Sequence, residues 1–277
     1  MKRCLFQLVR CNVVALVSLA VLTPAMLSSA VVVGQLRPNK AQINYRTPKR
    51  QFQAKLYRGR TYQVEASFVQ ANPRLVQQVV ERLHRNISVV LKKFPDHSTK
   101  DLNTVRYFIM HGPDAVGGGR PSGLAFIRSG QPERKQHLDP NWDNSVVIWS
   151  GKNYANLTDL WAQKSVAHEL AHAYHLHRWP EKQPEILAAY DSAMKEGLYR
   201  DVRDIKGTVT KKAYATVNQL EYFAELSAMY FVGCNYEPVN RLQLKNYDPR
   251  GFQMIEQMWA VRRGSTAPKS KLLQENN

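Results

Sequence analysis

The stretch VAHELAHAYH, residues 166–175, constrains the fold more than any other part of this chain. It holds three histidines and a glutamate, and its other residues are mostly apolar. On an α-helix, residues four apart lie on one face with Cβ atoms roughly 5–6 Å apart. The spacing therefore predicts a helix, from about Asn156 to His177, that carries His168 and His172 side by side.

Two histidines at this spacing can both turn a ring nitrogen toward one metal ion. Glu169 lies one position further on, beside the ion, where its carboxylate can hold a metal-bound water. H-E-x-x-H on a helix is the signature of zinc metallopeptidases. The alternative is a polar helix with coincidental histidines, and the apolar residues between them count against it.

A catalytic zinc needs a third protein ligand and an open fourth position. In metzincins the motif continues to a glycine and a third histidine, but those positions hold His175 and Arg178 here, which excludes that class. His175 shares the ligand face, yet it lies about 10 Å further along the helix axis. We expect it to support a ligand from behind or to face the substrate, and a surface histidine is the alternative.

The segment LEYFAELSAMYF, residues 220–231, offers a better third ligand. Glu221 and Glu225 lie four apart on an otherwise apolar helix, and buried carboxylates need partners. We expect Glu221 to bind the metal and Glu225 to accept the outer ring N–H of a ligating histidine. A solvent-facing pair is the alternative, but little of this helix is polar.

Together, HELAHAYH and YATVNQLEYFAE resemble the catalytic domain of anthrax lethal factor and its relatives, a branch of the gluzincin metallopeptidases. The resemblance covers roughly residues 140–260. The second motif of that family is a tyrosine, seven positions to the ligand glutamate, then an aromatic pair, alanine and a second glutamate. The matching residues are Tyr214, Asn218, Glu221, Tyr222, Phe223, Ala224 and Glu225.

The resemblance implies a zincin-like α+β domain, with a small mixed sheet, an active-site helix and a largely helical C-terminal half. It implies that one Zn²⁺ is bound by His168, His172 and Glu221, and that Glu225 orients a ligand. It makes Glu169 the general base and Tyr214 the donor to the developing oxyanion, although thirteen tyrosines make a packing role for Tyr214 an open alternative. It also implies that the strand at 145–150 is the sheet edge that pairs with an extended peptide.

The expected function is that of an exported, zinc-dependent endopeptidase, a monomer that acts on peptide or protein substrates. Zinc would bring its bound water close to ionisation, and Glu169 would take the proton during attack on the scissile carbonyl. One alternative is a pseudopeptidase that keeps its zinc and binds without turnover. A cell-surface binding protein and a peptidoglycan-cleaving hydrolase are two others.

Residues 1–30 have the pattern of an export signal. Lys2, Arg3 and Arg10 precede an apolar run, and Ser28 and Ala30 form a small-residue cleavage site. The pattern predicts a secreted, periplasmic or extracellular protein.

An uncleaved membrane anchor over Val13 to Val33 is the alternative to cleavage. Cleavage would remove Cys4 and Cys11 and leave Cys234, which we expect to be an inert, semi-buried thiol.

The formal net charge of +17 is concentrated near the N-terminus, since residues 37–60 hold eight Lys or Arg and no acid. We expect residues 31–60 to form a mobile basic arm or pro-segment, drawn to anionic surfaces such as cell-wall polymer, lipid or polynucleotide. No nucleic-acid-binding motif accompanies this charge, so no specific nucleic acid is expected. Residues 61–263 would form the metallopeptidase domain and residues 264–277 a polar tail.

The remaining patterns predict one α+β domain without internal repeats. Asn72 and Pro73 open a helix as its N-cap and first residue, and one apolar stripe follows. Further strands are expected at 61–69, 105–110, 124–127 and 145–149, and further helices at 184–199, 219–231 and 251–263.

Overall fold

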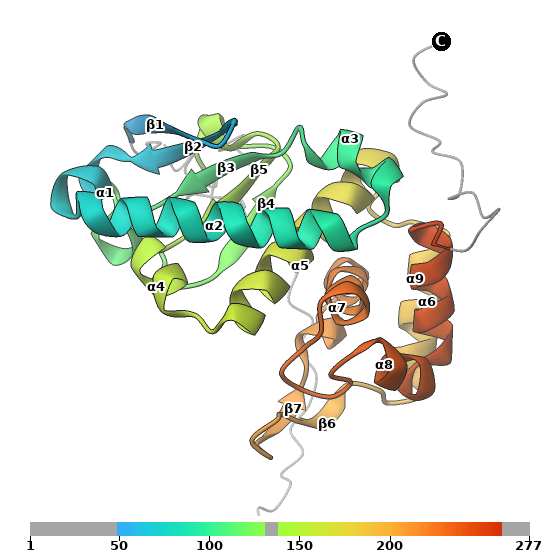
Figure 1. The fold of residues 1–277 in the computed structure, drawn as a ribbon. Helices are drawn as coiled ribbons and strands as arrows, with labels where there is room; N and C mark the ends of the chain where they lie inside the picture. Colours follow the sequence, from blue (N-terminus) through green and yellow to red (C-terminus); the bar gives the residue numbers. More distant parts are fainter. Residues whose placement is uncertain (1–48, 131–137, 262–277) are drawn as a thin grey trace, which may run out of the picture. The chain divides into compact units, whose positions relative to one another are not determined.

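A five-stranded sheet organises the N-terminal half of the part that the computed structural model describes, residues 49–130 and 138–261. Its order is β1-β2-β3-β5-β4 (Figure 1). The three central strands run parallel, and each edge strand is antiparallel to its neighbour. The strands are β1 (Phe52–Tyr57), β2 (Arg60–Glu65), β3 (Arg106–Ile109), β4 (Leu124–Ile127) and β5 (Ser145–Ile148).

The strand expected at the sheet edge lies inside the sheet. β5 is hydrogen-bonded to β3 on one side and to β4 on the other, with Phe126 opposite Val146. All four residues of β5 are buried, whereas those of β4 are partly exposed. The predicted edge at 145–150 is therefore wrong, and β4 is the edge strand on this side.

The basic segment before residue 60 is partly ordered into this sheet. β1 and β2 form a hairpin whose two turn residues, Arg58 (φ 47°) and Gly59 (φ 80°), both adopt left-handed conformations. Such a pair matches the twist of a two-residue hairpin turn, and glycine adopts it at little cost. The prediction of a mobile arm extending to residue 60 is therefore wrong for residues 52–60.

One long helix, α2 (Pro73–Lys93), packs along the sheet (Figure 1). Asn72 caps it as predicted, because its side chain accepts a hydrogen bond from the Leu75 amide. The apolar stripe is buried, with Leu83 fully inaccessible. Truncating such a residue to alanine typically costs about 2–5 kcal/mol. Between β2 and this helix, α1 (Ala66–Ala71) replaces the second half of the strand expected over 61–69.

The other face of the sheet carries a smaller aromatic cluster. Its buried members include Phe108, Trp142 and Trp149, and the Trp142 and Trp149 rings pack edge to face 5.3 Å apart. The buried Glu65 carboxylate accepts hydrogen bonds from the backbone amides of His111 and Val116. These bonds hold the loop after β3 against the sheet.

The helix with the histidine motif is α5 (Asp159–Arg178), which follows the short α4 (Gly151–Asn156). It begins three residues later than predicted because Leu157 is extended and the Thr158 hydroxyl caps the new helix through the Trp161 amide. α5 packs against α2, against β4 and most extensively against α7. This places the motif between the sheet and the C-terminal helices (Figure 1).

The C-terminal half is largely helical, as expected. α6 ends before the predicted Tyr199, because Gly197 turns the chain with φ +74°. A hairpin of β6 and β7, absent from the sequence prediction, follows it. The elements are α6 (Pro184–Lys195), β6 (Arg200–Arg203), β7 (Val209–Lys212), α7 (Gln219–Phe231), α8 (Arg241–Tyr247) and α9 (Pro249–Met258).

Short helical turns complete the description. They are η1 (Asp96–Ser98), α3 (Thr99–Leu102), η2 (Gly112–Asp114), η3 (Pro140–Trp142) and η4 (Tyr214–Thr216).

The described chain thus has the mixed α/β architecture expected of an α+β domain. The predicted signal at 1–30, residues 31–48 of the predicted basic arm or pro-segment, and the tail at 264–277 lie outside the described residues. Cys234 is a free thiol that is more deeply buried than the semi-buried position expected for it. Among the described helices, none combines the length and apolarity needed to cross a membrane.

Candidate metal centre

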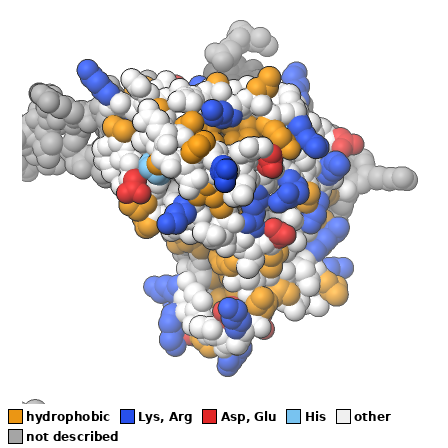
Figure 2. Space-filling model, turned by 60° about the vertical axis from the view of Figure 1, so that its left-hand side comes forward, with side chains coloured by type: hydrophobic (Ala, Val, Ile, Leu, Met, Phe, Trp, Pro, Cys, Tyr) orange, Lys and Arg blue, Asp and Glu red, His pale blue; other side chains and the backbone are white. Residues whose placement is uncertain are grey.

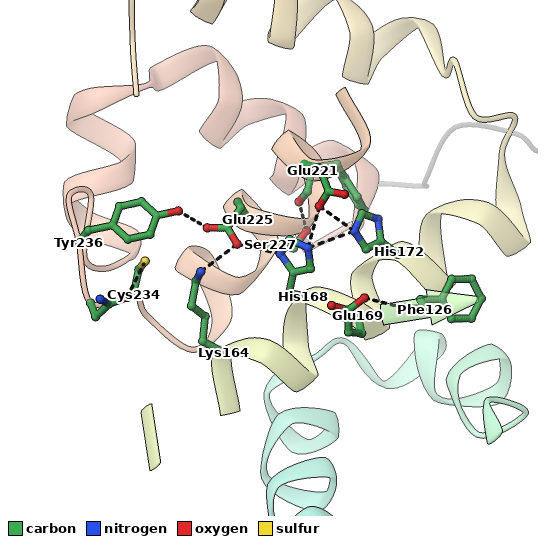
Figure 3. Close-up of polar contacts among 12 residues, drawn as sticks. Phe126, Lys164, His168, Glu169, His172, Glu221, Glu225, Ser227, Cys234 and Tyr236 are labelled. Atoms are coloured by element: carbon green, nitrogen blue, oxygen red, sulfur yellow. Dashed lines mark hydrogen bonds and ion pairs between the residues drawn. The ribbon is translucent and has the colours of Figure 1, made fainter. Parts of the chain in front are cut away.

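Two helices bring the predicted ligands together. α5 supplies His168 and His172, and the first turn of α7 supplies Glu221, whose amide is capped by Asn218 (Figure 3). Glu221 Oε2 lies 2.9 Å from His168 Nε2 and 3.2 Å from His172 Nε2. The two Nε2 atoms are 3.1 Å apart. One potential ligand atom from each residue therefore converges on a common point.

These separations fit a small cation with tetrahedral coordination. Zinc–nitrogen and zinc–oxygen bonds of roughly 2.0–2.2 Å place neighbouring ligand atoms of a tetrahedron roughly 3.3 Å apart. The three observed distances, between 2.9 and 3.2 Å, are slightly shorter than this. Two imidazoles and one carboxylate also form a donor set that zinc prefers.

The charges around the centre favour a divalent cation as well. Glu169, Glu221 and Glu225 contribute three carboxylates, and the cationic side chain buried among them is Lys164. With neutral histidines the cluster carries two excess negative charges. Buried charges are costly unless they are compensated, and a 2+ ion would balance these two.

The same neighbouring charges shift the pKa values of the predicted ligands. Burial by itself lowers the pKa of His168, but hydrogen bonds to Glu221 and Glu225 outweigh it and raise that pKa to about 10. Burial raises the pKa of Glu221, but His168 and His172 outweigh it and lower that pKa to about 2. The site therefore draws positive charge to itself, which a proton on His168 or a metal cation can supply.

Glu225 lies behind His168, on the side of the ring where the sequence interpretation expected it. Its Oε1 lies 2.8 Å from His168 Nδ1, on the side of the ring away from Glu221 (Figure 3). The same oxygen lies 2.8 Å from Lys164 Nζ, and the Tyr236 hydroxyl donates to Oε2. This network fixes the orientation of the His168 ring, and in the neutral ring that a metal would bind it favours the proton on Nδ1.

Lys164 and Tyr236 are site residues that the sequence interpretation missed. Lys164 precedes His168 by four residues, so the i, i+4 rule that paired the histidines also places it on their face. That signal was available. Tyr236 had no comparable signal, because it reaches Glu225 from the loop after α7.

Glu169 lies between the metal centre and the edge strand. Its side chain is buried, and its Oε2 accepts the backbone amide of Phe126 at 2.7 Å (Figure 3). The Phe126 amide thus points away from β5, toward α5. The interaction holds the carboxylate beside the ligands without making it one of them.

Tyr214 lies close to the ligands and is half-exposed. Its ring centroid is 5.7 Å from that of His168, and 53% of the residue is accessible. Partial burial and the Glu221 carboxylate raise the pKa of its hydroxyl to about 12, so the hydroxyl keeps its proton at neutral pH. It can therefore act as a hydrogen-bond donor next to the metal centre.

His175 does not have the predicted placement. Its side chain is fully buried, with Nε2 3.0 Å from the Pro180 carbonyl and the ring against Phe223. Burial lowers the pKa of His175 to about 4, so the ring is neutral and donates to Pro180. The expectation that His175 supports a ligand from behind, faces the substrate or lies at the surface is wrong, because the helix face that carries the predicted ligands continues into the core and the ring there contacts Pro180 and Phe223.

Comparison with known sequences adds no relative to this description. Models of protein families match no part of the chain, and a search of characterised proteins finds no similar sequence. The resemblance to lethal factor therefore rests on the motif residues and their spacing.

Proposed function

We propose that this protein is a zinc-dependent endopeptidase with a zincin-like domain of the lethal factor type. The observation that carries the proposal is the convergence of His168, His172 and Glu221 at 2.9–3.2 Å, with Glu169 beside them. A metal site needed only for stability would require no such carboxylate next to its ligands. The proposal includes export through the predicted signal at residues 1–30.

The three converging residues would hold one Zn²⁺. When bound, zinc acts as a Lewis acid that activates a water molecule and polarises the scissile carbonyl. Glu169 accepts a proton from the attacking water at a carboxylate oxygen and returns it to the leaving amine. The Phe126 amide keeps the Glu169 side chain in place during both transfers.

Tyr214 stabilises the negative charge that develops on the carbonyl oxygen. Its protonated hydroxyl donates a hydrogen bond, and its partly exposed position leaves it reachable by substrate. Donors of this kind act more strongly in the transition state than on the neutral carbonyl.

The substrate backbone pairs with β4 in this proposal. β4 is an edge strand that packs against α5. Its Phe126 amide already donates to Glu169, so the substrate backbone would pair with the other outward-facing backbone groups of β4. An extended peptide added at such an edge gains main-chain hydrogen bonds with little dependence on sequence. β4 takes the role first assigned to residues 145–150.

The test is digestion of a peptide library followed by mass spectrometry, with the zinc-loaded protein and its zinc-loaded Glu169→Gln variant. The proposal predicts cleavage by the first and none by the second. Equal cleavage by both would refute the role of Glu169. Absence of cleavage by both proteins would favour a zinc-binding pseudopeptidase or a substrate other than peptide.

A further inference from the structure

A pocket of about 550 Å³ adjoins the metal centre between the start of α5 and the β6–β7 hairpin. Two residues of its wall also belong to the centre. Tyr214 packs beside His168, and Tyr236 donates to Glu225. A group bound in this pocket would therefore lie next to the proposed reaction site.

The position of Trp161 gives the distance between the far wall of the pocket and the metal centre. Trp161 lines the pocket and precedes His168 by seven residues, two turns on the same helix face. Seven residues of helix span about 10 Å. The nearer wall of the pocket is Tyr214, whose ring centroid lies 5.7 Å from that of His168. An extended peptide advances about 3.3 Å per residue, so the pocket, between these two walls, would receive a side chain two or three residues from the scissile bond.

The wall of the pocket is unusually apolar for exposed surface. Trp161 is 38% exposed, Tyr214 53% and Val217 57%. Single exposed apolar residues are common, but several that gather around a pocket indicate a binding surface. The adjoining hairpin adds Val209, which is 40% exposed. These side chains suit a large apolar or aromatic group.

The hairpin that forms the rim of the pocket has a basic excess. Residues 200–212 hold five Lys or Arg and two acids, and Lys212 and Asp204 both line the pocket. Asp201 forms an ion pair with Lys211, and the Asp204 carboxylate accepts hydrogen bonds from two backbone amides of its own turn. Lys and Arg side chains crowd the lower end of Figure 2, at the level where Figure 1 places this hairpin.

The geometry points to a specificity pocket for polypeptides that carry a large apolar side chain two or three residues from the scissile bond, with acidic residues beside it. The apolar wall selects the side chain, and the basic rim selects the neighbouring charge. This inference rests on the proposed function and names the substrate class of that site.

Two peptides that differ at one position test it, one with Phe and one with Ala two or three residues from the cleaved bond. The zinc-loaded protein should show a kcat/KM at least roughly tenfold higher for the Phe peptide. Thr210 of β7 lines the pocket, so Thr210→Phe fills it and should abolish that preference while cleavage of the Ala peptide continues. Thr210→Ser, which leaves the space open, and Leu242→Ala, at a site 70% exposed on α8, should keep it.

The charge requirement is tested with acidic and neutral versions of the Phe peptide. Lys212→Glu should reverse a preference for the acidic version, and added salt should weaken that preference. Equal kcat/KM for the Phe and Ala peptides in the unmodified protein would overturn the assignment of a specificity pocket and leave the peptidase proposal intact.

If the zinc-loaded protein cleaves no peptide, the proposed function fails and the pocket is tested by binding. Fluorescence anisotropy then measures the affinity of fluorescein-labelled Phe and Ala peptides. Tighter binding of the Phe peptide, lost in Thr210→Phe, would support the pocket. Equal affinities would overturn it.

Discussion

Lys164 and Glu225 form a buried ion pair across α5 and α7, with Nζ and Oε1 2.8 Å apart. The same Glu225 oxygen lies 2.8 Å from Nδ1 of His168, a proposed zinc ligand. Both side chains of the pair are nearly inaccessible, at 6% and 2%. A lysine that binds neither metal nor substrate in this proposal thus helps to set the position of a proposed ligand.

Lys164→Met should weaken both folding and zinc binding. Removing one partner of a buried ion pair typically costs 3–5 kcal/mol, because the other charge stays uncompensated. Loss of a group that orients a ligand should lower zinc affinity about 10–100-fold. Denaturant unfolding and a competitive zinc titration measure the two effects. Lys195→Met, at an exposed position on α6, is the matched control and should change neither.

A double-mutant cycle separates the pair from its surroundings. Lys164→Met combined with Glu225→Gln removes both charges, so the double variant should be less destabilised than the sum of the single variants. We expect a coupling free energy of about 1–3 kcal/mol. Additive losses in unfolding experiments would show that the two charges do not depend on each other.

Tyr214→Phe should reduce turnover and leave the metal in place. Loss of one oxyanion donor typically lowers kcat about 10²–10³-fold. KM and zinc affinity should change little, since the removed hydroxyl is not a ligand. Steady-state kinetics on a cleaved peptide, with zinc content measured in parallel, checks this. A kcat equal to that of the unmodified protein would assign Tyr214 a packing role.

His175 makes folding sensitive to acid. Its pKa is lowered from 6.5 to about 4, so the folded state binds its proton later than the unfolded state as pH falls. Its stabilising contribution is complete above pH 6.5 and is lost as pH falls through about 4. The shift corresponds to about 3 kcal/mol.

His175→Leu should flatten this part of the pH dependence. Denaturant unfolding of the two zinc-free proteins at pH 7, 5.5 and 4 gives the comparison. The difference in unfolding free energy between them should shrink as pH falls. A constant difference would show that His175 does not titrate in this range.

Local patterns predicted the helices that carry the site. The bounds of α7 agree with the expected 219–231, because Asn218 caps the helix and its sequence is apolar up to Phe231. The pairing of Glu225 with a histidine also followed from spacing, since residues four apart share a face. These features depend on neighbours in the sequence.

Features set by distant neighbours were not predicted. The strand order depends on which strands pair, and β4 and β5 have similar apolar sequences, so composition does not tell the edge from the interior. The β1–β2 hairpin has a basic sequence, and β1 lies at an edge of the sheet. From composition alone, such a sequence is not distinguished from a mobile basic arm. Burial of His175 depends on Pro180 and Phe223, whose positions the helix pattern does not reveal.

The most direct test of the metal centre is zinc stoichiometry by native mass spectrometry, with affinities from competition against a chelating dye. The account predicts one tightly held zinc in the unmodified protein and in Glu169→Gln. It predicts a large loss of affinity in His172→Ala and in Glu221→Ala. Unchanged affinity in Glu221→Ala, or loss of zinc in Glu169→Gln alone, would contradict the assignment of ligands and base.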